Sequence, residues 1–378
     1  MSRVYVARCP DYRPGTVERA LYESLQAVTS GGSLIKAGQR VVLKANLLQG
    51  QPPEKAITTH PAIVAAVARW VREAGATPII ADSPGGLFNR RALSKVYQVT
   101  GMLAAAEEAR AVLNDDFRTV RVSCPECRAA KSFHALRAVV EADAIINLPK
   151  FKTHGLVQFT GSIKNLFGTV PGVTKGRYHA RFPTVETFSA MLVDILEYCK
   201  PVLTVMDAIV GMEGDGPSGG DPRHVGLLLA GTDPVAVDVV AATIAGMAPL
   251  SVPPIAAAAR RGLTSARVKD IEILGSPVDS VKVAGFRRPR TGVEHMRMIP
   301  RPVPAWVTDQ LLASPQAGPG CTVCGVCKDN CPVGAITISN GRAHMDLERC
   351  IRCYCCHELC PADAVELHRS LLSRVLSR

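Results

Sequence analysis

The sequence predicts an α/β fold, in which an open and mostly parallel sheet is flanked by helices, followed by a small α+β unit that is rich in cysteine. Apolar stretches with strand-like and helix-like spacing alternate along residues 1–280. The 378 residues are 47 % hydrophobic, which is enough to bury a sizeable core. Nine of the 13 cysteines lie within 321–360. We therefore expect an α/β domain at 1–280, a linker at 281–317, a small domain at 318–367 and an amphipathic tail at 368–378.

The individual elements follow from hydrophobic spacing and from Gly and Pro signals. Short apolar runs that end in polar or Gly-rich turns predict strands at 4–8, 41–46, 78–82, 120–123, 144–147, 202–207, 225–230 and 270–274. Amphipathic or apolar spacing predicts helices at 16–28, 62–73, 91–113, 188–198 and 234–245. Thr59 or His60 lies at the expected N-cap of the second helix, and Pro61 occupies its first turn. This alternation is typical of parallel strands joined by crossover helices.

Polar residues cluster where the predicted strands end. In an open parallel sheet, ligands bind beyond the carboxyl ends of the strands, where loop amides and helix N-termini converge. Each such residue by itself is also a common turn or cap residue. Agreement among five strand ends favours a site, and the residues concerned are Lys44, Asn46, Asp82, Ser83, Asn147, Lys150, Lys152, His154, Asp207, Glu213, Asp215 and Asp233.

The segment between Asp143 and Glu186 contains no acidic residue, although it contains several basic ones. A segment with only positive charges next to strand ends suits an anionic ligand, whether a carboxylate or a phosphate. The alternative is a solvated basic surface. We expect His154 and His179 to transfer protons near neutral pH. The residues expected to bind the anion are Lys44, Asn46, Asp82, Lys150, Lys152, Lys164, Asn165 and Arg177. Residues 160–165 add a candidate helix N-terminus, which is a general anion-binding feature.

Charge and hydropathy exclude other classes of function. The formal net charge is +11, yet aromatic residues are few and no helix-turn-helix or RNP-like pattern occurs, so we expect no nucleic-acid partner. No signal peptide and no uncharged apolar run of about 18 residues is present, so we expect a cytoplasmic protein without a membrane span. In that reducing setting cysteines indicate metal binding and not disulfides. We expect Cys124 and Cys127 to be free thiols in a surface turn.

Two cysteine runs carry the most specific signal in the sequence. Both 321–332 and 350–361 read C-x2-C-x2-C-x3-C-P, the bacterial ferredoxin pattern in which the fourth cysteine of each run ligates the other [4Fe-4S] cluster. A zinc ribbon would use two C-x2-C pairs, and a disulfide knot does not suit a chain without a secretory signal. We name the ligands of cluster 1 the cluster 1 set (Cys321, Cys324, Cys327 and Cys360) and those of cluster 2 the cluster 2 set (Cys331, Cys350, Cys353 and Cys356). Cys355 is expected to bind neither cluster.

Several segments of the large domain together resemble the DUF362 family, whose members often carry a 4Fe-4S ferredoxin domain. The segments are Leu43-Lys-Ala-Asn46, Thr58-Thr-His-Pro61, Ala81-Asp-Ser-Pro-Gly85, 147–154 (NLPKFKTH), 161–168 (GSIKNLFG), 207–214 (DAIVGMEG) and 230–238 (AGTDPVAVD). The resemblance implies the fold and an association with iron–sulfur clusters, and it names neither a reaction nor a substrate. Ala45 departs from the usual Lys-Pro-Asn pattern of the family.

These observations predict an iron–sulfur oxidoreductase with two [4Fe-4S] clusters and a small ferredoxin-like domain. It would exchange single electrons with an external donor or acceptor, such as a ferredoxin or flavodoxin-like protein, and pass them to an anionic substrate or unrecognised cofactor. Cluster and substrate should then lie close together, with the linker folding back over the strand ends. Two alternatives stay open, namely an electron carrier whose large domain is a docking scaffold, and a non-redox enzyme with structural or sensory clusters.

Overall fold

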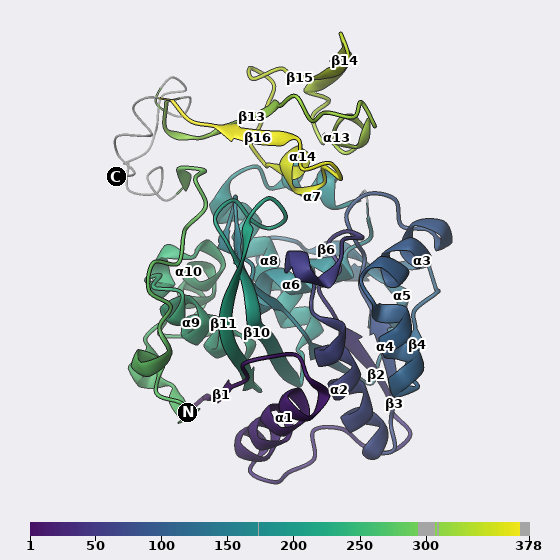
Figure 1. Cartoon of the computed structure of the whole chain (residues 1–378), viewed down its shortest axis with the longest axis vertical. Coiled ribbons are helices and arrows are strands. Elements are labelled where there is room, and N and C mark those ends of the chain that lie inside the picture. Colours follow the sequence, from purple (N-terminus) through teal and green to yellow (C-terminus); the bar gives the residue numbers. More distant parts are fainter. Residues whose placement is uncertain (173, 294–306, 308–309, 371–378) are drawn as a thin grey trace.

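The computed structural model describes residues 1–172, 174–293, 307 and 310–370. The larger part is an α/β unit with a ten-stranded sheet, and the smaller part lies above the tip of the β10–β11 hairpin in Figure 1. The sheet strands are β1 (Arg3–Arg8), β2 (Arg40–Lys44), β3 (Thr77–Ala81), β4 (Val112–Leu113), β7 (Ala144–Asn147), β8 (Lys150–His154), β9 (Gln158–Phe159), β10 (Leu203–Glu213), β11 (Asp221–Gly231) and β12 (Glu272–Gly275). A separate hairpin pairs β5 (Thr119–Ser123) with β6 (Ser132–Leu136).

The main path of the sheet runs β12-β1-β11-β10-β7-β2-β3-β4. Most neighbours are parallel, whereas β11 is antiparallel to β1 and β10, and β9 is antiparallel to β8. The expectation of an open, mostly parallel sheet with flanking helices is therefore confirmed. The long β10–β11 hairpin replaces two shorter strands expected at 202–207 and 225–230, because both strands continue beyond the apolar runs that signalled them.

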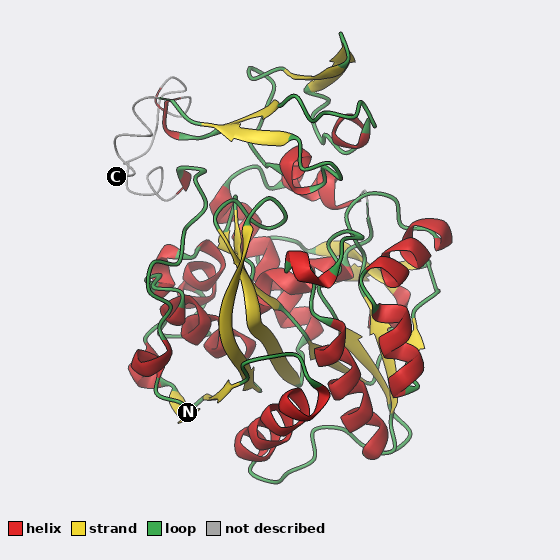
Figure 2. Ribbon diagram, viewed as in Figure 1, coloured by secondary structure: helices red, strands yellow, loops and turns green. Residues whose placement is uncertain are grey.

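Helices cover both faces of the sheet (Figure 2). They are α1 (Pro14–Thr29), α2 (Pro61–Glu73), α3 (Arg90–Val99), α4 (Met102–Ala109), α5 (Arg137–Val140), α6 (Ser162–Asn165), α7 (Thr174–Arg181), α8 (Val185–Cys199), α9 (Pro234–Ile244) and α10 (Pro253–Arg260). Short 3-10 helices are η1 (Pro53–Lys55), η2 (Leu166–Thr169), η3 (Pro249–Ser251), η4 (Val268–Asp270) and η5 (Val278–Val281). Successive strand residues point to opposite faces, so Val42 packs in the core of α8, α9 and α10, whereas Leu43 packs in the core of α1, α2 and α4.

Local sequence explains where several helices begin and end. His60 caps α2 through Nδ1, which accepts from the Ala62 N–H at 3.2 Å, and Pro61 follows at the first position. The helix expected over 91–113 is divided into α3 and α4. Gly101 adopts a φ of +75° between them, a value that glycine tolerates and that ends the first helix.

The small part, residues 314–368, is called the C-terminal unit below. Its elements are β13 (Ser314–Ala317), α13 (Val326–Asp329), β14 (Ile336–Ser339), β15 (Arg342–Met345), α14 (Cys355–Glu358) and β16 (Val365–His368). β13 pairs with β16, so this unit includes four residues that the sequence placed in the linker. The rest of the expected linker lies partly, and the amphipathic tail mostly, outside the described residues.

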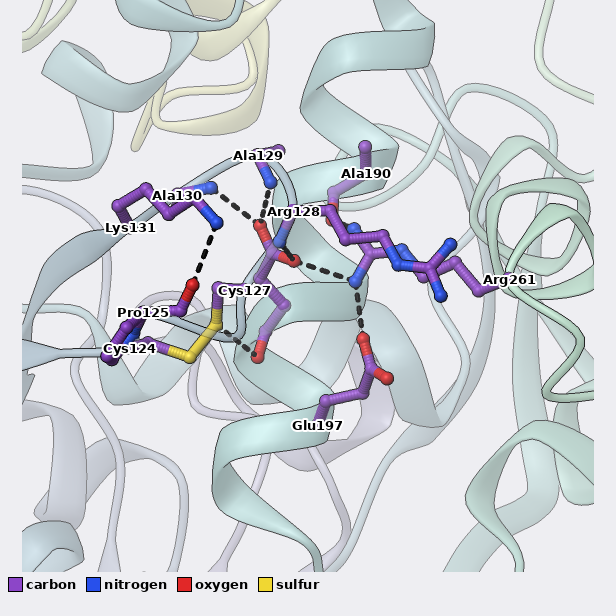
Figure 3. Close-up of a disulfide and its surroundings, with 11 residues drawn as sticks. Cys124, Pro125, Cys127, Arg128, Ala129, Ala130, Lys131, Ala190, Glu197 and Arg261 are labelled. Carbon is purple, nitrogen blue, oxygen red and sulfur yellow. Dashed lines mark hydrogen bonds and ion pairs between the residues drawn. A yellow bond between two sulfur atoms is a disulfide. The ribbon is translucent and has the colours of Figure 1, made fainter.

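The prediction of free thiols in a surface turn at Cys124 and Cys127 is wrong. The two sulfurs form a disulfide, and the side chains are only 1 % and 3 % exposed. Figure 3 shows the turn lying against α8, where the carboxylate of Asp194 accepts hydrogen bonds from the backbone N–H groups of residues 128, 129 and 130. Arg261 pairs with the same carboxylate at 2.7 Å. The spacing of residues in the sequence does not predict this packing of α8 and α10 against the turn.

Among the described residues, no helix is both long and apolar enough to cross a membrane.

Candidate functional site

A cavity of about 60 Å³ lies where the strand ends of the large unit meet the C-terminal unit. Its wall includes residues that directly follow β2 and β3, residues of β8 and of α6 to α7, and one face of α14. The polar or reactive side chains in the wall are Asn46, Asp82, Ser83, Lys152, His154, Thr160, Lys164, Asn165, Lys175, His179, Asn330, Cys355 and Glu358. The strand ends therefore converge as the alternation of strands and helices predicted.

Lys44 supports this wall from behind and does not line it. Its fully buried ammonium group pairs with Asp82 at 2.8 Å and donates to the carbonyl oxygen of Ala45 at 2.6 Å. Burial lowers the pKa of Lys44, and the nearby Asp82 carboxylate opposes that shift. Asp82 also accepts from the Leu47 N–H at 2.6 Å. The pair fixes the loops after β2 and β3, and its charges are already compensated.

Lys150, also expected to bind the anion, lies outside the cavity wall. Its ammonium group is fully buried, 2.7 Å from an Asp207 carboxylate oxygen and 3.0 Å from the Tyr12 hydroxyl. Side chains alternate along β8, so Lys150 and Lys152 lie on the same face of the strand but at different depths. Lys150 thus neutralises a buried carboxylate, a role that periodicity alone does not reveal.

Lys152 lines the cavity, although its three N–H donors are already used. They reach Asn46 Oδ1 at 3.0 Å and the carbonyl oxygens of Ile57 and Pro217 at 2.6 and 3.2 Å. Burial lowers the pKa of Lys152 to about 7, because no carboxylate contacts the ammonium group. Lys152 therefore contributes positive charge to the cavity but has no N–H donor left for a direct contact with a ligand.

Lys164 and Lys175 are the cations with donors left for a ligand. Lys164 on α6 has no hydrogen bond or ion pair within the described chain, and its ammonium group lies 5.0 Å from the centroid of the Phe167 ring. Lys175 on α7 donates to the carbonyl oxygens of Ser83 and Pro84 and keeps one N–H. Burial lowers the pKa of Lys175 to about 7. Arg177, on the same helix, is exposed and does not line the cavity, so the structure does not support its expected role.

His154 is the clearest hydrogen-bonding group without a partner. Its Nδ1 accepts from the Leu156 N–H at 3.1 Å, so Nε2 carries the proton of the neutral ring. Nε2 is buried without a hydrogen-bond partner in the described residues, and Glu358 Oε2 is 3.7 Å away. Burial and nearby positive charge lower the pKa of His154 well below its ordinary value. The side chain therefore presents a fixed N–H donor to the cavity.

His179 is also neutral. Burial lowers its pKa to about 3, and the ring stacks on Phe188 with centroids 4.3 Å apart. The expectation that His154 and His179 exchange protons near pH 7 is therefore not supported. Desolvation of a charged imidazole, which the sequence cannot report, is the physical reason.

The helix N-terminus expected to bind an anion is already occupied by the protein. One Asp238 carboxylate oxygen accepts from the Ser162 N–H at 2.5 Å, and the other accepts from the Ile163 N–H at 3.0 Å. Burial raises the pKa of Asp238 to about 7, despite these two hydrogen bonds. The anion-binding feature is real, but its ligand comes from α9.

Asn165, at the other end of α6, connects three segments. Its Nδ2 donates to the Lys44 carbonyl at 3.1 Å and to Asn147 Oδ1 at 2.8 Å, while its Oδ1 accepts from Asn46 Nδ2 at 2.9 Å. Asn46 and Asn165 both line the cavity, as expected from the sequence. Their amides are consumed by this network, so they shape the cavity floor.

The C-terminal unit closes the cavity through α14, through Leu359 after it, and through Asn330 at the end of α13. The Ser218 hydroxyl, in the β10–β11 turn, donates to the Glu358 carbonyl at 2.9 Å. His357 Nε2 lies 2.9 Å from the Asp215 carbonyl oxygen. Glycines of the large unit make room for side chains of this unit, since a Cβ at Gly155 or Gly219 would approach Tyr354 or His357, respectively. The small unit thus lies over the strand ends, as the sequence suggested.

The eight expected ligands divide into two separate chambers. One is lined by the whole cluster 1 set, and the other by the whole cluster 2 set. Nowhere in the described chain do three His, Cys, Asp or Glu side chains close around a point suitable for a single metal ion. A cubane is larger than one ion and needs thiolates spread around it, so two chambers with four cysteines each fit two [4Fe-4S] clusters.

The two cysteine loops share one backbone pattern. Val323 and Gly325 in the first loop have φ values of +57° and +80°, and Arg352 and Tyr354 at the equivalent positions have +51° and +62°. The final ligands agree as well, because backbone N–H groups of residues 335 and 364 each donate to the cysteine four positions earlier at 3.2 Å. In this alignment Cys355 corresponds to Val326, which supports its exclusion from the ligands.

Some cavity residues were not among those expected from the sequence. Lys175 belonged to the acid-free segment but had no strand end to mark it. Cys355 and Glu358 lie in the C-terminal unit, and only docking of that unit brings them to the cavity. The four-residue helix α14, which presents both, is the equivalent of α13 in the internal repeat.

Comparisons with known proteins agree with this architecture. A family model described as "Domain of unknown function (DUF362)" matches residues 41–243. A thylakoid-associated protein of Synechocystis sp. is 36 % identical over 264 residues, which cover 69 % of this chain and 79 % of that protein. One subunit of an ion-translocating oxidoreductase complex of Methanosarcina acetivorans is 42 % identical over 48 residues, 13 % of this chain and 18 % of that protein.

The solved structure of the lactate racemase apoprotein from Thermoanaerobacterium thermosaccharolyticum is similar with a TM-score of 0.41 and 14 % identity. The match covers 66 % of this chain and 58 % of the racemase.

Proposed function

We propose that this chain, which belongs to the DUF362 family, is an iron–sulfur oxidoreductase that passes single electrons to an anionic substrate or cofactor in the cavity. The observation that carries the proposal is the composition of the cavity wall. Lys164 and His154 present unused donors in this wall, which also contains Cys355, the residue before Cys356 of the cluster 2 set. The proposed binding site and the proposed electron source would therefore occupy adjacent spaces.

When bound, the two clusters would supply single electrons. The cluster 1 set and the cluster 2 set would hold them, since each set lines its own chamber. The partner on the other side would be an external one-electron carrier. The similarity over 48 residues to one component of an oxidoreductase complex supports a redox role.

The protein's own residues would bind and orient the anion. Lys164 supplies the charge, His154 Nε2 donates a hydrogen bond, and the remaining N–H of Lys175 donates another. Hydrogen bonds to a charged group contribute about 1.5–3 kcal/mol each. Lys152 and Lys175, and not the two histidines, are the groups that gain or lose a proton near pH 7.

An electron carrier with an inert scaffold remains the alternative to be tested. A cavity that contains a buried donor without a partner favours a bound ligand over a scaffold, because an unsatisfied donor costs about 1–3 kcal/mol.

The test begins with protein purified without oxygen. Iron is counted, the EPR spectrum is recorded after reduction with dithionite, and the denatured supernatant is analysed for released small molecules. The proposal requires about eight irons per chain and a co-purifying anion, which Lys164→Gln should lose and Arg177→Gln should retain. Eight irons with no anion retained or bound would favour the electron carrier. Far fewer irons after careful reconstitution would overturn the proposal.

A further inference from the structure

Cys355 lies in the wall between the cavity and the chamber of the cluster 2 set. Among the described residues it alone lines both spaces. Its side chain is 7 % exposed, and it immediately precedes Cys356 of the set. Whatever binds in the cavity is therefore separated from that chamber by one thiol.

The thiol also lies in the same chamber wall as all four residues of the cluster 2 set. Its S–H group is a hydrogen-bond donor, and one residue separates it along the chain from Cys353. Hydrogen bonds to cluster sulfurs are one of the means by which a protein sets a reduction potential. A substitution of Cys355 is therefore expected to change the reduction potential of cluster 2 without changing any of its four ligands.

The chamber of the cluster 1 set has a different environment. Both chambers are lined only by the C-terminal unit, but the chamber of the cluster 1 set shares no lining residue with the cavity. Cys324 is exposed, and Val323 beside it is 42 % exposed. The two chambers are thus unequal, one facing the cavity and the other facing the outside of the C-terminal unit.

We infer that Cys355 is a positioning residue that couples the cavity to cluster 2, so that cluster 2 is next to the substrate and cluster 1 is next to the external carrier. The inference rests on the proposed function. Each electron that reaches the ligand crosses the wall at Cys355, which forms no bond to the ligand and is itself neither oxidised nor reduced. The orphan His154 Nε2, which lies in the same wall, is independent evidence that a ligand binds there.

The internal repeat provides matched variants. Cys355→Val installs the residue that the first loop carries at this position and removes the donor, whereas Cys355→Ser retains a donor. Val326→Ala changes the equivalent position of the first loop, which does not line the cluster 1 chamber. Lys164→Gln removes a positive charge from the cavity.

The experiment is a redox titration of each holoprotein, followed by EPR, after the iron content has been measured. Cys355→Val should move one of the two reduction potentials to a more negative value and leave the other unchanged, Cys355→Ser should restore most of the shift, and Val326→Ala should move neither. Lys164→Gln should move the same potential as Cys355→Val, also to a more negative value.

The inference is overturned if Cys355→Val leaves both potentials unchanged, if it moves both equally, or if Lys164→Gln moves the other potential. Loss of about four irons in Cys355→Ser as well as Cys355→Val would also overturn it, because Cys355 would then be a ligand. If Cys355→Val alone loses iron, the Lys164→Gln and Cys355→Ser titrations decide. Wild-type protein with far fewer than eight irons would count against the proposed function instead.

Discussion

Leu359 fills the space that a side chain at position 85 would occupy: an ideal Cβ built on Gly85 would lie 2.0 Å from Leu359 Cδ2. Gly85 follows β3 in the large unit, and Leu359 directly follows α14 in the C-terminal unit. Both residues line the cavity. The absence of one side chain therefore determines how closely the C-terminal unit approaches the strand ends.

Adding a methyl group at Gly85 should loosen this contact. We expect Gly85→Ala to destabilise docking by about 1–3 kcal/mol, the usual cost of overpacking, and to accelerate hydrogen exchange of the amides in α14. Gly176→Ala is the control, because the nearest atom to its new Cβ is the Asn330 carbonyl oxygen at an ordinary 3.4 Å. Leu359→Ala combined with Gly85→Ala should recover part of the loss. Equal exchange in Gly85→Ala and wild type would show that the units are not held by this contact.

Anion affinity should depend on pH through Lys175. Its pKa is lowered to about 7 by burial, so the ammonium form that attracts an anion is lost as the pH rises through that value. Affinity measured by calorimetry should be highest below pH 7 and should fall above it, by at most about tenfold per pH unit for one proton. Lys175→Gln should bind more weakly at pH 6 and show a flatter profile.

Arg177→Gln is the matched control for that profile, since Arg177 lies on α7 but is exposed. Its affinity should decline with pH as in the wild type. An affinity that stays constant up to pH 10 in the wild type would contradict the assignment of Lys175.

Lys150 should matter for stability and not for binding. Lys150→Met would leave the Asp207 carboxylate buried with only the Tyr12 hydroxyl and backbone N–H groups as partners. Removing one member of a buried ion pair costs about 3–5 kcal/mol, which denaturant unfolding followed by circular dichroism would measure. Replacing Asp207 by Leu in the same chain should restore part of the stability. A stable Lys150→Met protein that no longer binds the anion would contradict the position found here.

The crossing of ligands between the two cysteine runs has its own test. Cys360 belongs with the first run and Cys331 with the second. Cys360→Ser should therefore disturb cluster 1 and leave the cluster 2 potential sensitive to Lys164→Gln. Cys331→Ser should disturb cluster 2 and remove that sensitivity, as EPR titration of the double variants would show. The reverse pattern would mean that each run holds its own cluster.

Residue spacing was enough to predict the sheet and the place of the cavity. Strand ends are marked by the change from apolar to polar residues, so Asn46, Asp82 and His154 were found in advance. The two cysteine sets were assigned from ligand spacing in a tight loop, which is local in sequence, and their binding of clusters stays a prediction.

Partners that come from distant elements could not be predicted. The pairing of Lys150 with Asp207 joins β8 to β10, and Asp238 reaches α6 from α9. In the sequence, Lys150 and the N-terminus of α6 both appear free to bind a ligand, and only the fold shows that a carboxylate of the protein already occupies each of them. Conversely, Cys355 looked like a spare thiol, because the sequence does not reveal which face of the C-terminal unit meets the large unit.

The two cysteine loops share one backbone pattern, so the backbone alone does not determine which half of the C-terminal unit contacts the large unit. A duplicated unit with two equal halves could dock through either half, and nothing in its backbone would distinguish the two orientations. The halves differ in the side chains between their cysteines, and the segment 328–330 (KDN) of one half corresponds to 357–359 (HEL) of the other. It is 357–359 that contacts the large unit, through hydrogen bonds with Asp215 and Ser218 and through the packing of Leu359 on Gly85. Side chains and not the backbone therefore set the orientation of the unit, and exchanging 328–330 with 357–359 should weaken docking in the present orientation.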